Sequence, residues 1–329
     1  MNTNTEHGNY VMDSFEFESG RTLENVNVEY STSGIPRYDD EGNIINAIVY
    51  FPTLKGGHSI LAKFHDIIYS DYPNEYFFIK ITSLGSPDSC SPSSTGLKQD
   101  FPMYTTKDRV NFKRQFLSEK FKIKKIFGLV GEGTGGFDVY TWACDYPDDM
   151  EFIIILNSTY KTYGQRYVML KTAEAMIDSC DDFYNGIYSV SVSKLIVAIA
   201  RLRFMCYYSD KIFNELSSDE IDVLLDDYVD ESLFMDIYDF KSRNECLLDY
   251  DIYDRLSNIK AKSLIIGIED YFGFNTEKDI LPLKDAIKDL KIIISKDKES
   301  FYTESDYSEI GLEIVSFLRQ FDLQLGYFF

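Results

Sequence analysis

The sequence predicts an α/β protein built on a mostly parallel sheet flanked by helices, with a helical segment inserted late in the chain. Three observations support this fold class. Short apolar runs alternate with helical stretches along most of the chain. The runs are apolar almost throughout, as expected of parallel strands that helices cover on both faces. The alternation stops between about Asn157 and Tyr253, where we find helical segments and no convincing strand.

Length and charge limit the function classes. A chain of 329 residues can form one large domain, or a core domain with an inserted cap. Its net charge of −21 repels phosphate backbones and anionic lipid, so we expect neither nucleic acid nor membrane partners. Six cations form a candidate local basic patch, although a solvated helix face leading into a strand is the simpler interpretation. They are Lys113, Arg114, Lys120, Lys122, Lys124 and Lys125.

The cysteines and the N-terminus suggest a cytoplasmic protein. The five cysteines are odd in number, scattered and without the spacing of metal ligands, so we expect reduced thiols and no metal. Met1 to Asn9 has neither the basic nor the apolar region of a signal peptide. No apolar run approaches the length of a membrane span.

The elements are predicted in chain order. Alternating residues around Ser19-Gly20 indicate two antiparallel strands, Phe15–Glu18 and Val26–Tyr30. The predicted parallel strands are Ala47–Phe51, Tyr76–Ile81, Ile126–Val130, Phe152–Leu156, Ser263–Ile268 and Ile292–Ile294. The predicted helices of the insertion are Tyr167–Asp178, Val190–Tyr208 and Ser218–Tyr228. We therefore predict a core of residues 1–158 and 255–329, and a helical cap of residues 159–254, whose acidic stretch Asp219 to Asp239 is interpreted as a solvated helix surface.

A glycine-rich turn, Gly131-Glu132-Gly133-Thr134-Gly135-Gly136, follows the strand Ile126–Val130 and precedes a helix that reaches about Asp145. Read literally it is G-x-G-x-x-G, in which glycines let a pyrophosphate approach a helix N-terminus. Glu132 argues against this, because it places a carboxylate in the loop that would hold phosphate. The next strand also ends in Asn157-Ser158 and lacks the acid that binds a ribose. We therefore expect no cofactor.

The second interpretation of the turn is a nucleophile elbow, the G-x-S-x-G motif between a strand and a helix. The register places Gly133 where the serine would stand. An elbow serine has a strained backbone with positive φ, which glycine adopts without penalty. Thr134 is the nearest hydroxyl, but it stands one residue late and enters the helix. The sequence therefore predicts an elbow without its nucleophile.

Several ordered segments together make the chain resemble the homoserine O-acyltransferase family, a branch of the α/β hydrolases. The likeness runs from about Phe15 to Phe317. Its segments are Asn46-Ala47-Ile48-Val49, Leu54-Lys55-Gly56, Leu84-Gly85-Ser86-Pro87, Asp100-Phe101-Pro102, Thr105-Thr106-Lys107-Asp108-Arg109-Val110, Gly135-Gly136, Trp142-Ala143, Tyr146-Pro147-Asp148, Ala175-Met176-Ile177-Asp178 and Gly186-Ile187-Tyr188. The resemblance implies an α/β-hydrolase fold with a helical cap.

The resemblance also implies a Ser-Asp-His triad that forms an acyl-enzyme from acyl-CoA. Carried onto this sequence, the serine position is Gly133, the aspartate is Asp270 and the histidine position is Lys298. The oxyanion-hole positions are Leu54 and Thr134. Near Glu174 the family is expected to have an arginine that holds the carboxylate of homoserine, so the substrate position is altered too.

These departures predict a catalytically degenerate protein with a binding or scaffold role. A small molecule under the cap is the expected ligand, and the resemblance implies a homodimer through the cap. The alternative is an active acyltransferase or hydrolase with rearranged chemistry that uses Thr134 or Lys298.

Overall fold

The central sheet is eight-stranded and mostly parallel, as predicted. The computed structural model describes residues 5–51, 76–205, 210–268, 275–295 and 304–321. In this part of the chain the strand order is β1-β2-β4-β3-β5-β6-β7-β8. β2 pairs antiparallel with β1 and β4, and all other neighbours are parallel. The strands are β1 (Glu6–Glu16), β2 (Thr22–Gly34), β3 (Ala47–Phe51), β4 (Phe77–Ile81), β5 (Ile126–Glu132), β6 (Met150–Leu156), β7 (Lys262–Ile268) and β8 (Leu290–Ser295).

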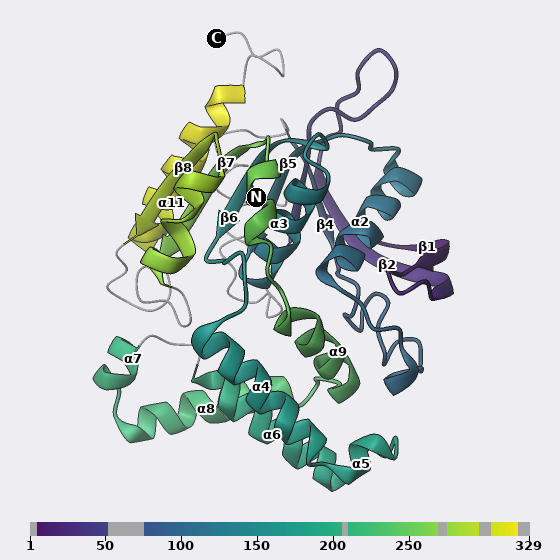
Figure 1. Cartoon of the computed structure of the whole chain (residues 1–329), viewed down its shortest axis with the longest axis vertical. Coiled ribbons are helices and arrows are strands. Elements are labelled where there is room, and N and C mark those ends of the chain that lie inside the picture. Colours follow the sequence, from purple (N-terminus) through teal and green to yellow (C-terminus); the bar gives the residue numbers. More distant parts are fainter. Residues whose placement is uncertain (1–4, 52–75, 206–209, 269–274, 296–303, 322–329) are drawn as a thin grey trace.

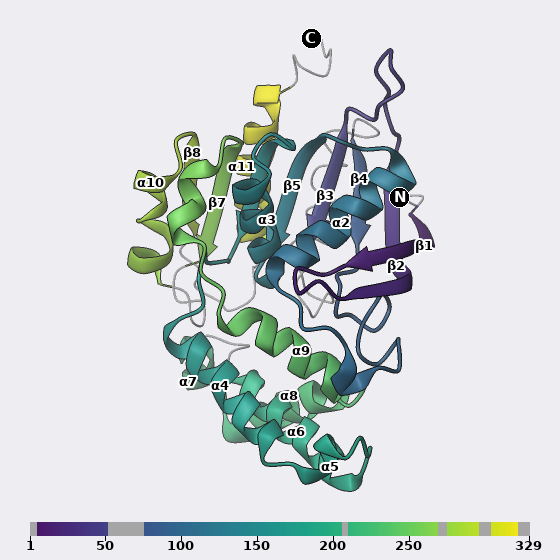
Figure 2. The ribbon, with the colours of Figure 1, turned by 45° about the vertical axis from the view of Figure 1, so that its right-hand side comes forward.

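Helices bury both faces of the sheet, which explains why the central strands are apolar throughout. Ile48 of β3 packs in a cluster with side chains of α11 (Glu304–Leu318), whereas the next residue, Val49, belongs to a cluster with α2 (Thr106–Phe121) and α3 (Thr134–Asp145). Successive side chains of a strand point to opposite faces, so each face needs its own apolar set. Figures 1 and 2 show α2 and α3 on one side of the strands and α11 on the other.

The six predicted parallel strands are confirmed to within two residues at each end. The first strand is predicted wrongly, because β1 spans Glu6–Glu16 and ends before Glu18. β1 is an edge strand with many exposed positions, so little apolar periodicity marks its first half. The predicted turn around Gly20 is confirmed, because the N–H of Phe17 donates to the carbonyl of Arg21 at 2.8 Å.

The segment between β6 and β7 is helical, and the structure has no strand in the part of it that is described. Its helices gather at the end of the sheet where β6 leads out (Figures 1 and 2). They are α4 (Gly164–Asp178), α5 (Asp181–Tyr184), α6 (Val190–Phe204), α7 (Asp210–Glu215), α8 (Ser218–Ser232) and α9 (Ile237–Leu248). α6 ends earlier than predicted, and α8 extends four residues beyond the predicted Tyr228.

The insertion is closed at its base by backbone pairing between its two ends. Lys161 forms an isolated antiparallel bridge with Asp251. The N–H of Thr162 donates to the carbonyl of Tyr250 at 2.7 Å, and that of Ile252 donates to Tyr160 at 3.0 Å. These contacts lie just inside the predicted limits of 159–254. The division of the chain into two folding units stays a prediction.

Short helices complete the description. They are η1 (Lys98–Asp100), η2 (Tyr253–Asn258), η3 (Thr276–Ile280) and α10 (Leu283–Ala286).

Hydrogen bonds at the start of α2 explain why the helix begins there. The Thr105 hydroxyl accepts from the N–H of Asp108, and the Asp108 carboxylate accepts from the N–H of Thr105 at 2.8 Å. This reciprocal capping satisfies two backbone donors at the first turn.

Candidate functional site

The glycine-rich turn forms a strand-to-helix elbow, as predicted. β5 ends at Glu132, Gly133 follows, and α3 begins at Thr134. Gly133 has φ 53° and ψ −117°, a conformation that side-chain-bearing residues adopt only under strain. The elbow is therefore present in backbone geometry, and its central residue has no side chain.

Hydrogen bonds from the neighbouring strand hold this elbow in place. The N–H of Gly133 donates to the carbonyl of Leu156 at the end of β6, at 3.0 Å. The Gly133 carbonyl accepts from the Ser158 hydroxyl at 2.7 Å and from the N–H of Gly136 at 3.1 Å. The turn is thus fixed by the segment after β6 as well as by its own helix.

The flanking glycines are explained by close packing of α3 on the sheet. A Cβ atom at Gly135 would lie 2.1 Å from the Phe51 carbonyl oxygen, and one at Gly131 would lie 2.6 Å from the Gly135 oxygen. Neither contact is sterically allowed, so only glycine fits. Packing accounts for this spacing without any bound phosphate, and Glu132 is buried in the turn. The dinucleotide interpretation loses its main support.

A buried carboxylate beside the elbow was not anticipated from the sequence. Asp279 of η3 is fully buried and accepts from the Thr159 hydroxyl at 2.5 Å, the Tyr163 hydroxyl at 3.0 Å and the N–H of Asn275 at 2.6 Å. Burial, with the nearby Asp279 carboxylate, raises the pKa of Tyr163, so the phenol stays a donor. The network ties the segment after β7 to the one after β6.

The sequence signal that could have found this cluster is the polar triplet Asn157-Ser158-Thr159 directly after a buried strand. Parallel strands place such residues together at the carboxyl edge of the sheet, where sites are usual. Asn157 has a positive φ of 44°, uncommon for a residue other than glycine, and its N–H donates to the Ile266 carbonyl at 2.9 Å.

A buried ionic cluster joins α2 to α3. Asp138, on α3, accepts from Arg109 Nη2 at 2.9 Å and from Lys113 Nζ at 2.8 Å, and both Lys113 and Asp138 have fully buried side chains. Burial lowers the pKa of Lys113 to about 8, against the opposing attraction of Asp138. Both interpretations of the sequence, a basic patch and a solvated helix face, are wrong for Lys113. Its side chain points into the core because α2 packs on α3.

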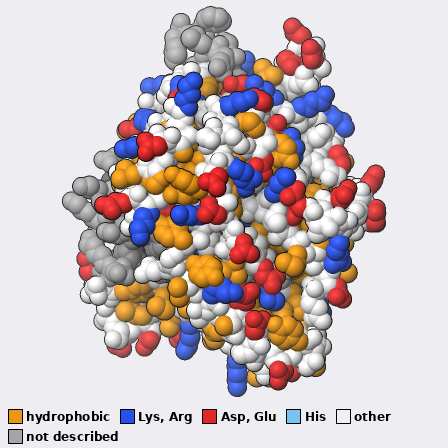
Figure 3. Space-filling view, viewed as in Figure 1, with side chains coloured by type: hydrophobic (Ala, Val, Ile, Leu, Met, Phe, Trp, Pro, Cys, Tyr) orange, Lys and Arg blue, Asp and Glu red, His pale blue; other side chains and the backbone are white. Residues whose placement is uncertain are grey.

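Two other cations of that predicted patch are paired with acids. Arg114 Nε donates to Asp149 at 2.7 Å, and its guanidinium lies 3.4 Å from the centre of the Tyr146 ring. Lys125 forms an ion pair with Glu151. Figure 3 shows acidic and basic side chains interspersed over one face. These residues therefore do not form a single basic surface.

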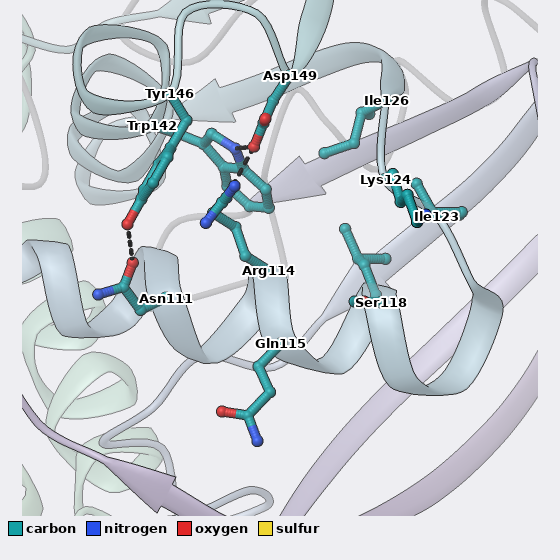
Figure 4. Close-up of a pocket in the computed structure, with 11 residues that line it drawn as sticks. Asn111, Arg114, Gln115, Ser118, Ile123, Lys124, Ile126, Trp142, Tyr146 and Asp149 are labelled. Carbon is teal, nitrogen blue, oxygen red and sulfur yellow. Dashed lines mark hydrogen bonds and ion pairs between the residues drawn. The ribbon is translucent and has the colours of Figure 1, made fainter.

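A hollow of about 440 Å³ lies beside Arg114, near the start of β5 and so at the opposite end of that strand from the elbow. Figure 4 shows some of its polar side chains bonded to one another: Trp142 Nε1 donates to Asp149 at 3.0 Å, and the Tyr146 hydroxyl donates to Asn111 at 2.6 Å. These side chains are therefore held in place by one another.

The predicted solvated acidic surface, Asp219 to Asp239, is confirmed for most of α8 but is wrong for its last residue. Asp239, on α9, is buried, and its two oxygens accept from the N–H and the hydroxyl of Ser93 at 2.8 and 2.6 Å. Tertiary contact with the loop after β4 buries this carboxylate. Within the described residues we find no helix long and apolar enough to cross a membrane and no cluster of candidate metal ligands.

Comparison with known proteins identifies the family. No family model matches the chain. A probable acyltransferase of Methanothermobacter thermautotrophicus is 33% identical over 310 residues, covering 94% of this chain and 96% of the relative. A homoserine O-acetyltransferase of Methanobrevibacter ruminantium is 25% identical over 340 aligned positions, covering 90% and 68%. The chain belongs to the homoserine O-acyltransferase family of the α/β hydrolases.

The fold agrees with this assignment. An acetylester hydrolase from Corynebacterium glutamicum matches the structure with a TM-score of 0.79 at 20% sequence identity, covering 95% of this chain and 96% of that chain. At this identity the match concerns the α/β-hydrolase fold alone.

Three of the positions inferred from the family resemblance, Leu54, Asp270 and Lys298, lie outside the described residues. Their assignment to the oxyanion hole and the triad stays a prediction, as does an ion pair between Asp270 and Lys298. Thr134 is the first residue of α3 and is partly buried, which agrees with the prediction that it enters the helix.

Glu174, where the family resemblance leads us to expect a substrate-binding arginine, lies on α4. Its carboxylate forms an ion pair with Lys171 one turn earlier on the same helix, and its side chain is mostly buried. In this structure the acid is therefore neutralised by a local lysine. Its effect on a substrate carboxylate stays a prediction.

Proposed function

We propose that this homoserine O-acyltransferase-like protein does not use triad catalysis and instead binds a small molecule beneath its helical insertion. One observation carries the proposal: the residue at the centre of the elbow, between β5 and α3, is Gly133. Glycine has no side-chain atom that could attack an acyl carbon. The predicted replacement of the family's histidine by Lys298 would also remove the general base.

The test is an acyl-transfer and ester-hydrolysis panel. CoA release is measured from short acyl-CoAs with homoserine, serine or water as acceptor, and hydrolysis is measured with p-nitrophenyl acetate. We expect the wild type to remain at background and the double variant Gly133→Ser, Lys298→His to gain hydrolysis. Gly133→Ala is the matched control, because it introduces the same backbone strain without a hydroxyl.

A displaced nucleophile is the second candidate, supported by the position of Thr134. Its hydroxyl makes no hydrogen bond to the residues that the structure describes, and its side chain is only partly buried beside the elbow. Relatives named acyltransferase and esterase also support retained chemistry. Wild-type turnover that Thr134→Ala abolishes would establish this candidate and refute the first. Ser158→Ala is the control, because that hydroxyl already donates to the Gly133 carbonyl.

We also propose a homodimer formed through the insertion. Large apolar side chains on its outer surface support this, with Phe234 93% and Val190 72% exposed. Light scattering coupled to size-exclusion chromatography tests it: we expect a dimer that Phe234→Asp weakens. A monomeric wild type at micromolar concentration would refute the proposal.

A further inference from the structure

A hollow of about 500 Å³ lies at the boundary between the insertion and the core. Residues of α5 and α9 form its wall on the insertion side, and residues between 98 and 107 form most of its wall on the core side. Figures 1 and 2 show α9 beside the core segment that leads into α2. A hollow of this volume is large enough to hold a small molecule.

The hollow is separate from the elbow, because Tyr250 stands between the two. Tyr250 borders the hollow, and its ring stacks on the ring of Phe137 of α3, with 4.1 Å between the ring centres. Its hydroxyl also donates to the Phe137 carbonyl at 3.2 Å. Neither Gly133 nor Thr134 is among the described residues that border the hollow. A ligand bound here would therefore occupy a second site, independent of any chemistry at the elbow.

Contacts between the two walls hold the hollow in shape. Lys98, on the core side, donates from Nζ to the Gly186 carbonyl of the insertion at 2.8 Å, and its Nζ lies 4.8 Å from the centre of the Tyr188 ring. The Thr106 hydroxyl of α2 lies 3.9 Å from the Cys246 thiol of α9. Because these contacts join the insertion to the core, we expect the hollow to be largely preformed, which lowers the entropic cost of binding.

Aromatic side chains make up much of the lining. On the core side Met103 is 75% exposed, and on α5 Tyr184 is 50% exposed, so the rim presents apolar surface to water. Aromatic rings attract organic cations, because the faces of the rings carry negative potential. The lining therefore suits an apolar molecule with a positive charge. The aromatic residues are Phe101, Tyr104, Phe183, Tyr184, Tyr238 and Tyr250.

The charged groups around the hollow also favour a cationic ligand. Lys107 pairs with Glu18 at 3.1 Å, and Lys241 pairs with Glu245 at 2.8 Å. Asp249, directly after α9, is exposed at the hollow, and its carboxylate forms neither a hydrogen bond nor an ion pair with any residue that the structure describes. The lysines are thus already neutralised, whereas this carboxylate is free to pair with a cation. The net charge of −21 adds a general attraction for cations.

We propose that this hollow binds an organic amine, whose apolar or aromatic body fills the space between α9 and the core and whose ammonium group pairs with Asp249. An amine is favoured over a carboxylate because each lysine at the hollow already has an acceptor. The ligand would contact the insertion and the core together, so its binding should stabilise the boundary between them.

The experiment measures dissociation constants by ligand-detected NMR with the full chain at neutral pH and constant ionic strength. The probes are phenethylamine, phenethyl alcohol and phenylacetate, which have similar aromatic bodies and differ in charge. We expect phenethylamine to bind most tightly and phenylacetate to bind at least about threefold more weakly, because one exposed ion pair contributes little. Asp249→Asn should weaken amine binding about two- to fivefold and leave alcohol binding unchanged. Asp226→Asn, which removes an exposed acid on α8, is the matched control.

Two further variants test the place of binding. Ser242→Trp should fill the hollow from the α9 side and abolish binding of all three probes. Met103→Lys changes an exposed residue of the rim, so it should leave the fold intact and weaken binding of the amine alone, by charge repulsion.

Four results would overturn the proposal. A wild type that binds none of the probes has no such site. Binding of the alcohol or the acid as tight as that of the amine excludes an amine site. An amine preference that survives in Asp249→Asn excludes pairing with this carboxylate. Unchanged binding in Ser242→Trp places the ligand elsewhere, and if that variant does not fold, unchanged amine binding in Met103→Lys leads to the same conclusion.

Discussion

Replacing Lys113 by methionine should stabilise this protein at neutral pH, because the ammonium is fully buried and its charged form is disfavoured. Burial lowers the pKa of Lys113 from 10.5 to about 8, even with Asp138 beside it. The difference of about 2.5 pH units, at 1.36 kcal/mol per unit, makes the charge cost roughly 3 kcal/mol in the folded state. Methionine has a similar length, and Arg109 still pairs with Asp138.

The sign of the pH dependence follows from which state binds the proton more tightly. Between pH 8 and 10.5 the unfolded chain keeps the proton on Lys113 while the folded chain releases it. The unfolded state therefore binds more protons in this window, and the free energy of unfolding rises with pH. Below pH 8 both states are protonated and the full cost is present; above 10.5 the cost is gone.

Urea unfolding of the wild type and of Lys113→Met, at several pH values from 7 to 10.5, measures both effects. We expect the variant to be more stable by up to about 3 kcal/mol at pH 7, with the difference shrinking as pH rises. Lys120→Met, an exposed lysine on the same helix, is the control and should show no such trend. A variant less stable than the wild type at pH 7, or a difference that does not change with pH, would refute this reasoning.

Three further predictions concern the elbow and its neighbours. Gly133→Ala should lower the free energy of unfolding by about 1–3 kcal/mol in urea, because it forces a side chain into positive φ; an unchanged value would mean the elbow is unstrained. Gly135→Ala should be more damaging, since its Cβ would overlap the Phe51 carbonyl, and a variant as stable as Gly133→Ala would contradict that packing. Asp279→Asn should cost about 2 kcal/mol or more and speed proteolysis after β7, because three donors lose a charged acceptor. An Asp279→Asn variant that resists limited proteolysis as well as the wild type does would contradict this.

The sequence predicts an element closely only where its residues show a clear apolar pattern. β3 is apolar throughout and β5 is apolar up to its last residue, Glu132, because helices cover both faces of these strands, and their limits are predicted closely. β1 is an edge strand whose pairing with β2 determines its extent, and its exposed residues leave no clear pattern. The elbow was predictable because a glycine-rich turn between a strand and a helix is a local feature.

The sequence by itself determined a mostly parallel α/β chain with a strand-to-helix elbow centred on Gly133, because strand patterns and turn residues are local properties. Only the tertiary structure decided which charges are buried. Lys113, Asp239 and Asp279 look like ordinary surface groups along the chain, yet each is buried where distant segments meet. Burial and pairing depend on residues far apart in sequence, so no local pattern can predict them.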